Sequence, residues 1–156
     1  MYRFVLFVLF LAFASICGAT KDETADEMKV RFETARAEDR AELAIRIAQK
    51  QTSAADKLYN DGKVDLANMA VDDVVSYSEK ARDAATETKK HLKEIEIDVR
   101  KMAQKLRDIK RTVAFDDQPP IDGAVQRLEN VRTDLLKAMF AKDKKKSSNF
   151  NFKESQ

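Results

Sequence analysis

Hydrophobic residues recur at alternating spacings of four and three residues across the middle of the chain, from Ala67 to Val113. This spacing is typical of one face of an α-helix, and no glycine or proline interrupts the stretch. The positions, hereafter the seam, are Ala67, Val71, Val74, Ser78, Ala81, Ala85, Thr88, Leu92, Ile95, Val99, Met102, Leu106, Ile109 and Val113. Only Ser78 and Thr88 are not hydrophobic, although the whole chain is just 44% hydrophobic. The seam predicts one long helix.

Breaks in the pattern flank this helix on both sides. Gly62 follows Asn60 and Asp61, which suits the left-handed residue that closes a helix, and the pair Pro119 and Pro120 suits a break followed by a first helical turn. Two breaks predict three helices, over residues 22–60, 64–113 and 120–140. At 1.5 Å per residue the central one would be about 75 Å long.

The two outer helices have apolar stripes of their own. The stripe of the first comprises Met28, Phe32, Ala35, Ala41, Ala44, Ile45, Ala48, Ala55, Leu58 and Tyr59, with Glu42 placed to pair with Arg46. The stripe of the third comprises Ile121, Ala124, Val125, Leu128, Val131, Leu135 and Met139. Small seam residues suit the alanine-rich first helix, and the larger ones from Leu92 onward suit the third. The pattern therefore predicts an all-α, elongated three-helix bundle, similar to an antiparallel coiled coil, in which the arms overlap on the central helix near 92–99.

The turn around Gly62 also resembles the turn between the two helices of a tetratricopeptide repeat. Tyr59 precedes the glycine, and Ala67 follows five residues after it. Further partial agreement comes from Ala48, Ala55, Val71, Val74 and Ala81. The resemblance covers residues 48–82, occurs once in the chain, and implies helix-turn-helix packing at this point without a peptide-binding groove.

The first residues have the three-part plan of a secretory signal peptide. Arg3 lies in a short basic region, an apolar run covers 4–13, and small residues lead to a cleavage site after Ala19. The alternatives are an uncleaved membrane anchor and an acylated Cys17, which Ile16 disfavours. We expect export to a periplasm or an extracellular space.

Cleavage changes what chemistry the chain can carry. It removes Cys17, the only cysteine, so residues 20–156 can form no disulfide, which is more usual in a bacterial envelope than in an animal extracellular fluid. It also removes Arg3 and leaves a net charge of about +1, which argues against a protein built mainly to bind polyanions. Residues 20–141 are enough for a single domain.

No pattern indicates catalytic, cofactor-binding or metal-binding residues. His91 is the sole histidine and is expected at the edge of the seam. Asp116, Asp117 and Asp122 are close in sequence, but the prolines between them break the spacing of a calcium loop. Asp72 and Asp73 are expected to face solvent on the central helix. The sequence does not predict an enzyme.

Two features indicate surfaces for partners. Residues 142–156 form a polar tail, predicted to be disordered, in which Lys142, Lys144, Lys145 and Lys146 could bind an anionic surface such as phospholipid headgroups. The seam is also widened at four flanking positions, Ala70, Val75, Tyr77 and Ala84, where a second copy of the chain or a protein partner could bind. Phe150 and Phe152 are too few to stack nucleic-acid bases.

The resulting hypothesis is an exported helical interaction or scaffold protein of the cell envelope. One alternative is a protein that opens its helices onto a lipid surface, although the uninterrupted seam fits this reading poorly. The other is a periplasmic holdase that grips unfolded clients between its long helices.

Overall fold

The computed structural model describes residues 23–153, with side chains for 23–141. Its helices are α2 (Ala25–Thr34), α3 (Ala37–Asn60), α4 (Val64–Thr88), α5 (Leu92–Lys110) and α6 (Gln118–Lys153), with a 3-10 turn, η1, at Phe115–Asp117. No strand occurs in this part of the chain. The prediction of an all-α bundle is confirmed, and the predicted signal peptide over 1–19 lies outside the described residues.

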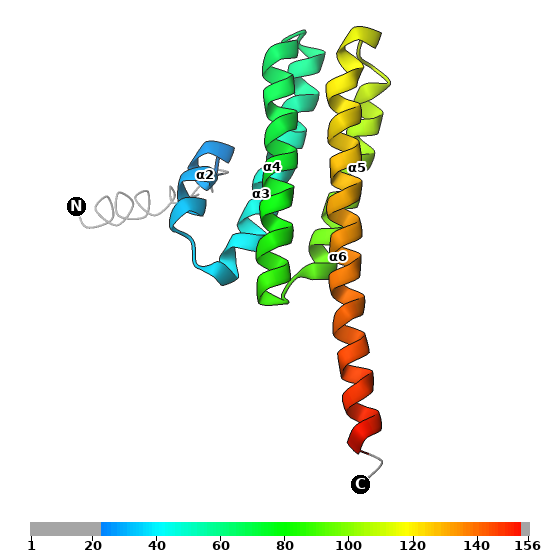
Figure 1. Cartoon of the computed structure of the whole chain (residues 1–156). Helices are drawn as coiled ribbons and strands as arrows, with labels where there is room; N and C mark the ends of the chain where they lie inside the picture. The colour runs from blue at the N-terminus through cyan, green and yellow to red at the C-terminus, as the bar shows by residue number, and fades with distance from the viewer. Residues whose placement is uncertain (1–22, 154–156) are drawn as a thin grey trace, which may run out of the picture.

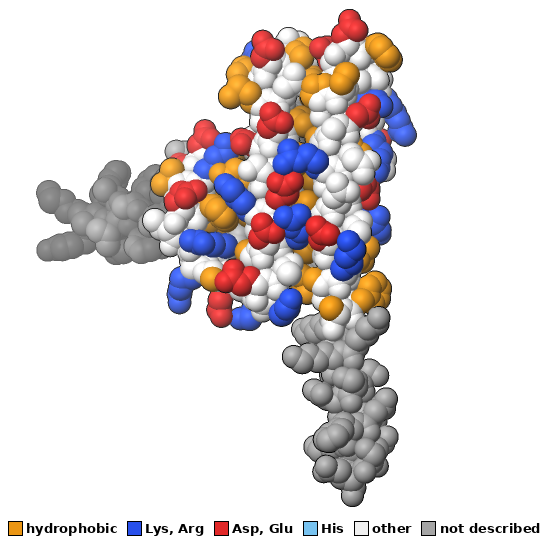
Figure 2. Space-filling model, in the orientation of Figure 1, with side chains coloured by type: hydrophobic (Ala, Val, Ile, Leu, Met, Phe, Trp, Pro, Cys, Tyr) orange, Lys and Arg blue, Asp and Glu red, His pale blue; other side chains and the backbone are white. Residues whose placement is uncertain are grey.

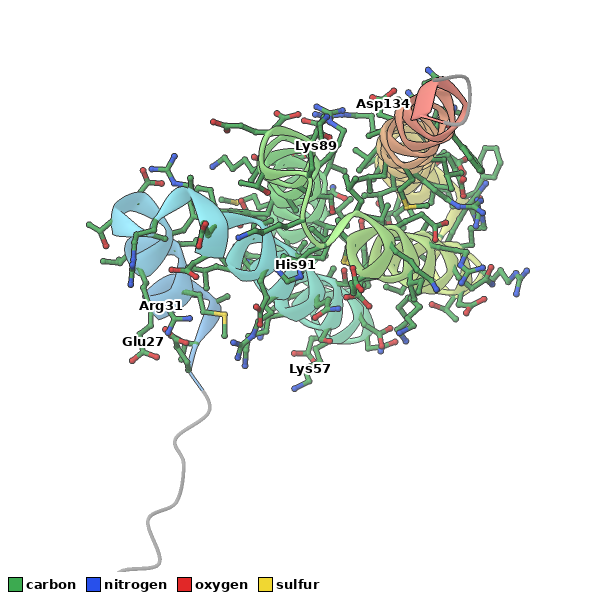
Figure 3. All side chains as sticks on the ribbon, turned by 90° about the horizontal axis from the view of Figure 1, so that it is seen from below. Glu27, Arg31, Lys57, Lys89, His91 and Asp134 are labelled. Carbon is green, nitrogen blue, oxygen red and sulfur yellow. The ribbon has the colours of Figure 1, made fainter. Side chains whose placement is uncertain are left out.

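The bundle consists of two antiparallel helical hairpins, α3–α4 and α5–α6, packed side by side (Figure 1). Helix α4 packs along α6, and α3 packs along α5, so the four helices form a square in cross-section (Figure 3). The first hairpin turns at Gly62, whose φ is +73°, and the Lys63 N–H donates to the Leu58 carbonyl at 2.8 Å. This is the left-handed closure that the glycine predicted.

The single central helix predicted over 64–113 is wrong. It is divided between α4 and α5 by Lys89, Lys90 and His91, and the chain reverses direction there. Lys89 (φ 56°) and His91 (φ 59°) are both left-handed, a conformation that costs a residue with a side chain roughly 1–2 kcal/mol. The two halves of the seam therefore lie side by side, and a bundle about 38 Å long, the length of α4, replaces the 75 Å rod.

The residues of the seam are nevertheless those that the pattern predicted to be buried. All are buried except Thr88 and Val113, which are half-buried. Residues 89–91, hereafter the link, separate Thr88 at the end of α4 from Leu92 at the start of α5. The seam residues face the core in both helices. Ser78 and Thr88 are tolerated because their hydroxyls donate to carbonyls one turn back, at 2.7 Å and 2.8 Å.

The bounds of the outer helices also differ from the prediction. The helix expected over 22–60 is interrupted at Ala35 and Arg36, both extended, so that α2 folds back on α3 and α4 through Met28. The helix expected over 120–140 runs from Gln118 to Lys153, and the tail predicted to be disordered over 142–156 is helical as far as Lys153. No glycine or proline occurs after Gly123, and the lysines that follow are good helix formers. The sequence therefore contains no helix-breaking residue that would end α6 before Lys153.

Side-chain size divides the core as expected. Alanines are frequent among the buried residues of α3 and α4, although α3 also buries Leu43, Ile45 and Ile47. Helices α5 and α6 contribute mainly larger residues such as Leu106, Leu128 and Leu135, all fully buried. Ile95 is 1% exposed, at the start of α5, in the region 92–99 where an overlap was predicted. Because α5 packs on α3 as well as on α6, residues on this helix contribute to the core between the two hairpins.

Substituting aspartate for the buried residue Ile95 tests the assignment of the core. We expect Ile95→Asp to lower the free energy of unfolding by about 4 kcal/mol, because the variant buries an unpaired carboxylate and removes a packed side chain. Lys93→Asp, on the exposed face of the same helix, should change it by less than about 0.5 kcal/mol. Urea unfolding followed by circular dichroism measures both, and equal losses would contradict the assignment of faces.

Candidate interaction surfaces

Helix α2 is held on the bundle by a polar cluster and an aromatic pair. The Lys29 ammonium donates to Asp73 Oδ2 at 2.6 Å, and the buried Gln51 amide donates to the same oxygen at 3.0 Å. Burial opposes the charge on Lys29, but the hydrogen bond and the charge of Asp73 outweigh it and raise the pKa of Lys29. Asp73 is therefore not the solvated residue that the sequence predicted, because α2 folds over it.

The aromatic contact covers part of the widened seam. Phe32 meets Tyr77 edge to face, with ring centroids 5.7 Å apart, and the Lys80 ammonium lies over both rings. Tyr77 is consequently 7% exposed. Of the other flanking positions, Ala70 and Val75 are buried and Ala84 is half-buried.

The surface that the sequence offered to a partner is therefore covered by the chain itself. The fold-back at residues 89–91 brings α6 against α4, and the break at Ala35 and Arg36 brings α2 onto Tyr77. A pattern along one helix indicates how wide its apolar face is, but it does not indicate which helix covers that face. Within one chain, these flanking residues are covered by α2 and α6.

Ion pairs connect the two hairpins. Between α6 and α4, both Arg127 Nε and Nη2 contact the Glu79 carboxylate at 2.9–3.1 Å, and Arg82 contacts Asp134 at 3.3 Å. Figure 2 shows mixed positive and negative side chains along this junction. On the other side of the square, Lys105 of α5 lies 2.6 Å from Asp56 of α3. Pairs of this kind contribute little stability each, but they specify which residues face one another.

A more buried network lies within the α5–α6 hairpin. Arg132 Nε donates to the buried Glu96 carboxylate at 2.6 Å, Arg107 donates to Glu129 at 2.6 Å, and Arg132 and Glu129 are 3.5 Å apart. The Arg107 hydrogen bond lowers the pKa of Glu129, and the charges of Arg107 and Arg132 add to the effect against burial. Each charge has an opposite neighbour, so the network joins the two helices.

The candidate chemical residues are not brought together. His91 is exposed in the link at one end of the bundle (Figure 3), whereas Asp116 and Asp117 lie in η1 at the other end. Asp122 pairs with Lys110 at 2.7 Å. Over residues 23–141 no group of three or more histidine, cysteine, aspartate or glutamate side chains is placed to hold a metal ion.

A cleft of about 400 Å³ lies beside the junction of α2 and α3. It is lined by Arg31, Thr34, Ala35, Arg36, Asp39, Glu42, Leu43 and Arg46. Glu42 and Arg46, expected to pair, are not within ion-pair distance in the described structure and instead both face this open space. Because the lining contains both carboxylates and guanidinium groups, it selects neither an anion nor a cation.

Large hydrophobic side chains are exposed at both ends of the bundle. Leu66 (52% exposed), Met69 (66%) and Phe115 (83%) lie near the two hairpin turns, where α4 and α6 begin. Phe140 (62%) lies on α6, many residues after its start and thus toward the opposite end of the bundle. The sequence gives no signal for these residues, because isolated hydrophobic positions outside a stripe carry no periodic pattern.

The network around Glu129 predicts a pH-dependent difference in stability. A lowered pKa in the folded state means that charged Glu129 stabilises the fold above its ordinary pKa of 4.5, and that this stabilisation is lost as the pH falls through the lowered value. Glu129→Gln should therefore be less stable than the unmodified chain at pH 7, and the difference should shrink as the pH falls below 4.5. Thermal unfolding from pH 7 to pH 3 measures it, and Glu94→Gln on the exposed face of α5 is the matched control.

Comparison with other proteins assigns no family to this bundle. None of the described helices combines the length and the apolar character needed to cross a membrane. The chain matches no family model, and neither a curated protein nor a solved structure shows significant similarity to it.

Proposed function

We propose that this protein is an exported helical interaction or scaffold protein, held at an anionic surface of the cell envelope by the end of α6. The observation that carries the proposal is that α6 continues past the other helices of the bundle as far as Lys153 (Figure 1). The lysines at 142, 144, 145 and 146 lie in this extension. They belong to a helix that is continuous with the bundle.

Electrostatics supports an anionic target. A lysine near a membrane surface rich in anionic lipid contributes about 1 kcal/mol of binding, so four of them are enough for reversible attachment. The bundle itself is less suited to this role, because many of its arginines and lysines are already paired with carboxylates. The two ends of the molecule would then differ, with the extension at the surface and the hairpin turns directed away from it.

Export is supported by the first nineteen residues, which have a basic start, an apolar run and a small-residue cleavage site. Cleavage after Ala19 would remove the only cysteine, Cys17. The described residues of the bundle are compatible with that loss, because hydrophobic packing and ion pairs hold them together. Exposed Leu66, Met69 and Phe115 are the hydrophobic residues available for a protein partner at the end away from the extension.

Vesicle binding tests the role of the extension. The processed chain, residues 20–156, should sediment with vesicles that contain phosphatidylglycerol and not with phosphatidylcholine vesicles. Changing Lys142, Lys144, Lys145 and Lys146 to glutamate should weaken binding at least a hundredfold, because roughly 4 kcal/mol of attraction is removed. The matched control changes four exposed bundle lysines, Lys57, Lys63, Lys93 and Lys101, to glutamate, and should retain most of the binding.

The same measurement separates the proposal from its rivals. Hydrogen exchange of the core amides should not change on binding if the bundle stays closed, whereas loss of protection throughout α3–α6 would favour a protein that opens onto lipid. Equal loss of binding in both lysine variants would contradict attachment through the extension. Suppression of client aggregation at stoichiometric amounts, without vesicle binding, would favour a holdase.

Export predicts a defined N-terminus. When the full chain is produced in a bacterial host, the protein in the periplasm should begin at Thr20, and its intact mass should correspond to residues 20–156. Ala19→Arg should prevent this cleavage, because the processing site requires a small residue there. Recovery of only the full-length chain, in the cytoplasm, would contradict export.

A further inference from the structure

We propose that two copies of this chain exchange their α5–α6 hairpins by straightening residues 89–91, which joins α4 and α5 into one helix. In the exchanged dimer, the α5–α6 hairpin of each copy packs on the α3–α4 hairpin of the other. The partner is thus a second copy of the same chain. This inference goes beyond the proposed attachment to an anionic surface and does not depend on it.

The link between the hairpins is strained where it bends. Lys89 and His91 both have positive φ, at 56° and 59°, and neither is glycine. Residues with a Cβ atom adopt this conformation uncommonly, because the Cβ atom approaches the backbone too closely, although histidine is found there more often than lysine. In a straightened link both residues would take ordinary helical angles. The bent form therefore carries a local cost that the exchanged form does not.

The sequence of the link is compatible with a helix in the correct register. The three residues are Lys89, Lys90 and His91, and all are exposed. Lysine is a good helix former and histidine an acceptable one. Ala85, Thr88, Leu92 and Ile95 follow one another at steps of three, four and three, so a continuous helix would keep the seam on one face. Neither half of the seam has to rotate relative to the other.

Each hairpin already carries the complete surface that the other hairpin needs. Glu79 and Arg82 of α4 meet Arg127 and Asp134 of α6, and Asp56 of α3 meets Lys105 of α5. The apolar core between the hairpins is shared in the same way. All of these contacts re-form between copies after exchange, so the dimer loses none of them. A second copy is the partner that supplies this set of groups in the matching arrangement.

The end of the bundle where the link lies is suited to meet a second bundle. Straightened helices would place two bundles end to end at their links. Phe140, 62% exposed, lies on α6 at this end, and α6 continues beyond it (Figure 1). In the dimer the ends of both α6 helices would enter the junction between the two bundles. The only side-chain bond in the described structure that ties the link to another helix joins Lys90 and Glu38 at 3.1 Å, and it is exposed.

Opposite substitutions in the link should move the monomer–dimer equilibrium in opposite directions. Lys89→Gly with His91→Gly relieves the strain of the bend and disfavours the helix, so it should raise the dimer dissociation constant at least a hundredfold. Lys89→Ala with His91→Ala keeps the strain and favours the helix, so it should lower that constant about tenfold. The chains are refolded from urea at high concentration, and light scattering on a sizing column gives the masses.

A matched control distinguishes the link from general effects of glycine. Lys93→Gly with Lys101→Gly places two glycines at exposed positions within α5 and should lower stability without raising the proportion of monomer. If the alanine and glycine variants of the link have the same dimer fraction, or if the alanine variant is monomeric at every concentration, the proposal is wrong.

Crosslinking separates hairpin exchange from dimerisation by surface contact. Equal amounts of ¹⁴N and ¹⁵N chains of the alanine variant are refolded together, and a carbodiimide joins Asp56 to Lys105, whose charged atoms are 2.6 Å apart. Random pairing makes about half of the dimers mixed, so about half of the peptides linked across this pair in the dimer fraction should carry both labels. Those in the monomer fraction should carry a single label. Single-label peptides alone in the dimer would overturn exchange. Vesicle binding is measured separately, so either proposal can fail alone.

Discussion

The α3–α4 and α5–α6 hairpins close the core of this bundle by packing against each other. Each hairpin packs its own two helices together, and the bundle is completed where α4 lies along α6 and α3 along α5. The bend at residues 89–91 makes this possible within one chain. Two left-handed residues cost roughly 2–4 kcal/mol together, whereas full burial of a single leucine or isoleucine contributes about 1.5–3 kcal/mol. With Leu128, Leu135 and Ile95 all buried, packing outweighs the strain.

Charged residues specify how the two hairpins meet. The arginine–carboxylate contact of Arg127 with Glu79 and the contact of Lys105 with Asp56 lie on opposite sides of the square. Such exposed pairs add little free energy each, but a shift of one hairpin along the other would separate several of them at once. The Glu96–Arg132 pair acts similarly within the second hairpin, where removal of one partner would leave a buried charge.

The proposed functions use parts of the molecule that the core does not need. The extension of α6 passes beyond the bundle, and the exposed side chains of Leu66, Met69 and Phe115 lie at the other end. A scaffold protein requires separate surfaces of this kind on a rigid body. Hairpin exchange would join two such bodies end to end at the links, so the hairpin turns of the dimer would point in opposite directions.

The sequence by itself determined the all-α class, the turn at Gly62 and the inward face of each core helix, because a period near 3.6 residues marks burial whatever the helix packs against. It did not reveal the bends at 89–91 and 35–36, since lysine, histidine, alanine and arginine are ordinary helical residues and no local signal opposes a straight helix. The tertiary structure alone shows which helices cover the seam, and that Ala70, Val75 and Tyr77 are buried within one chain. The physical reason is that hydrophobic burial is non-directional: the same apolar face is satisfied by a helix of its own chain or of another, and only the path of the chain decides between them.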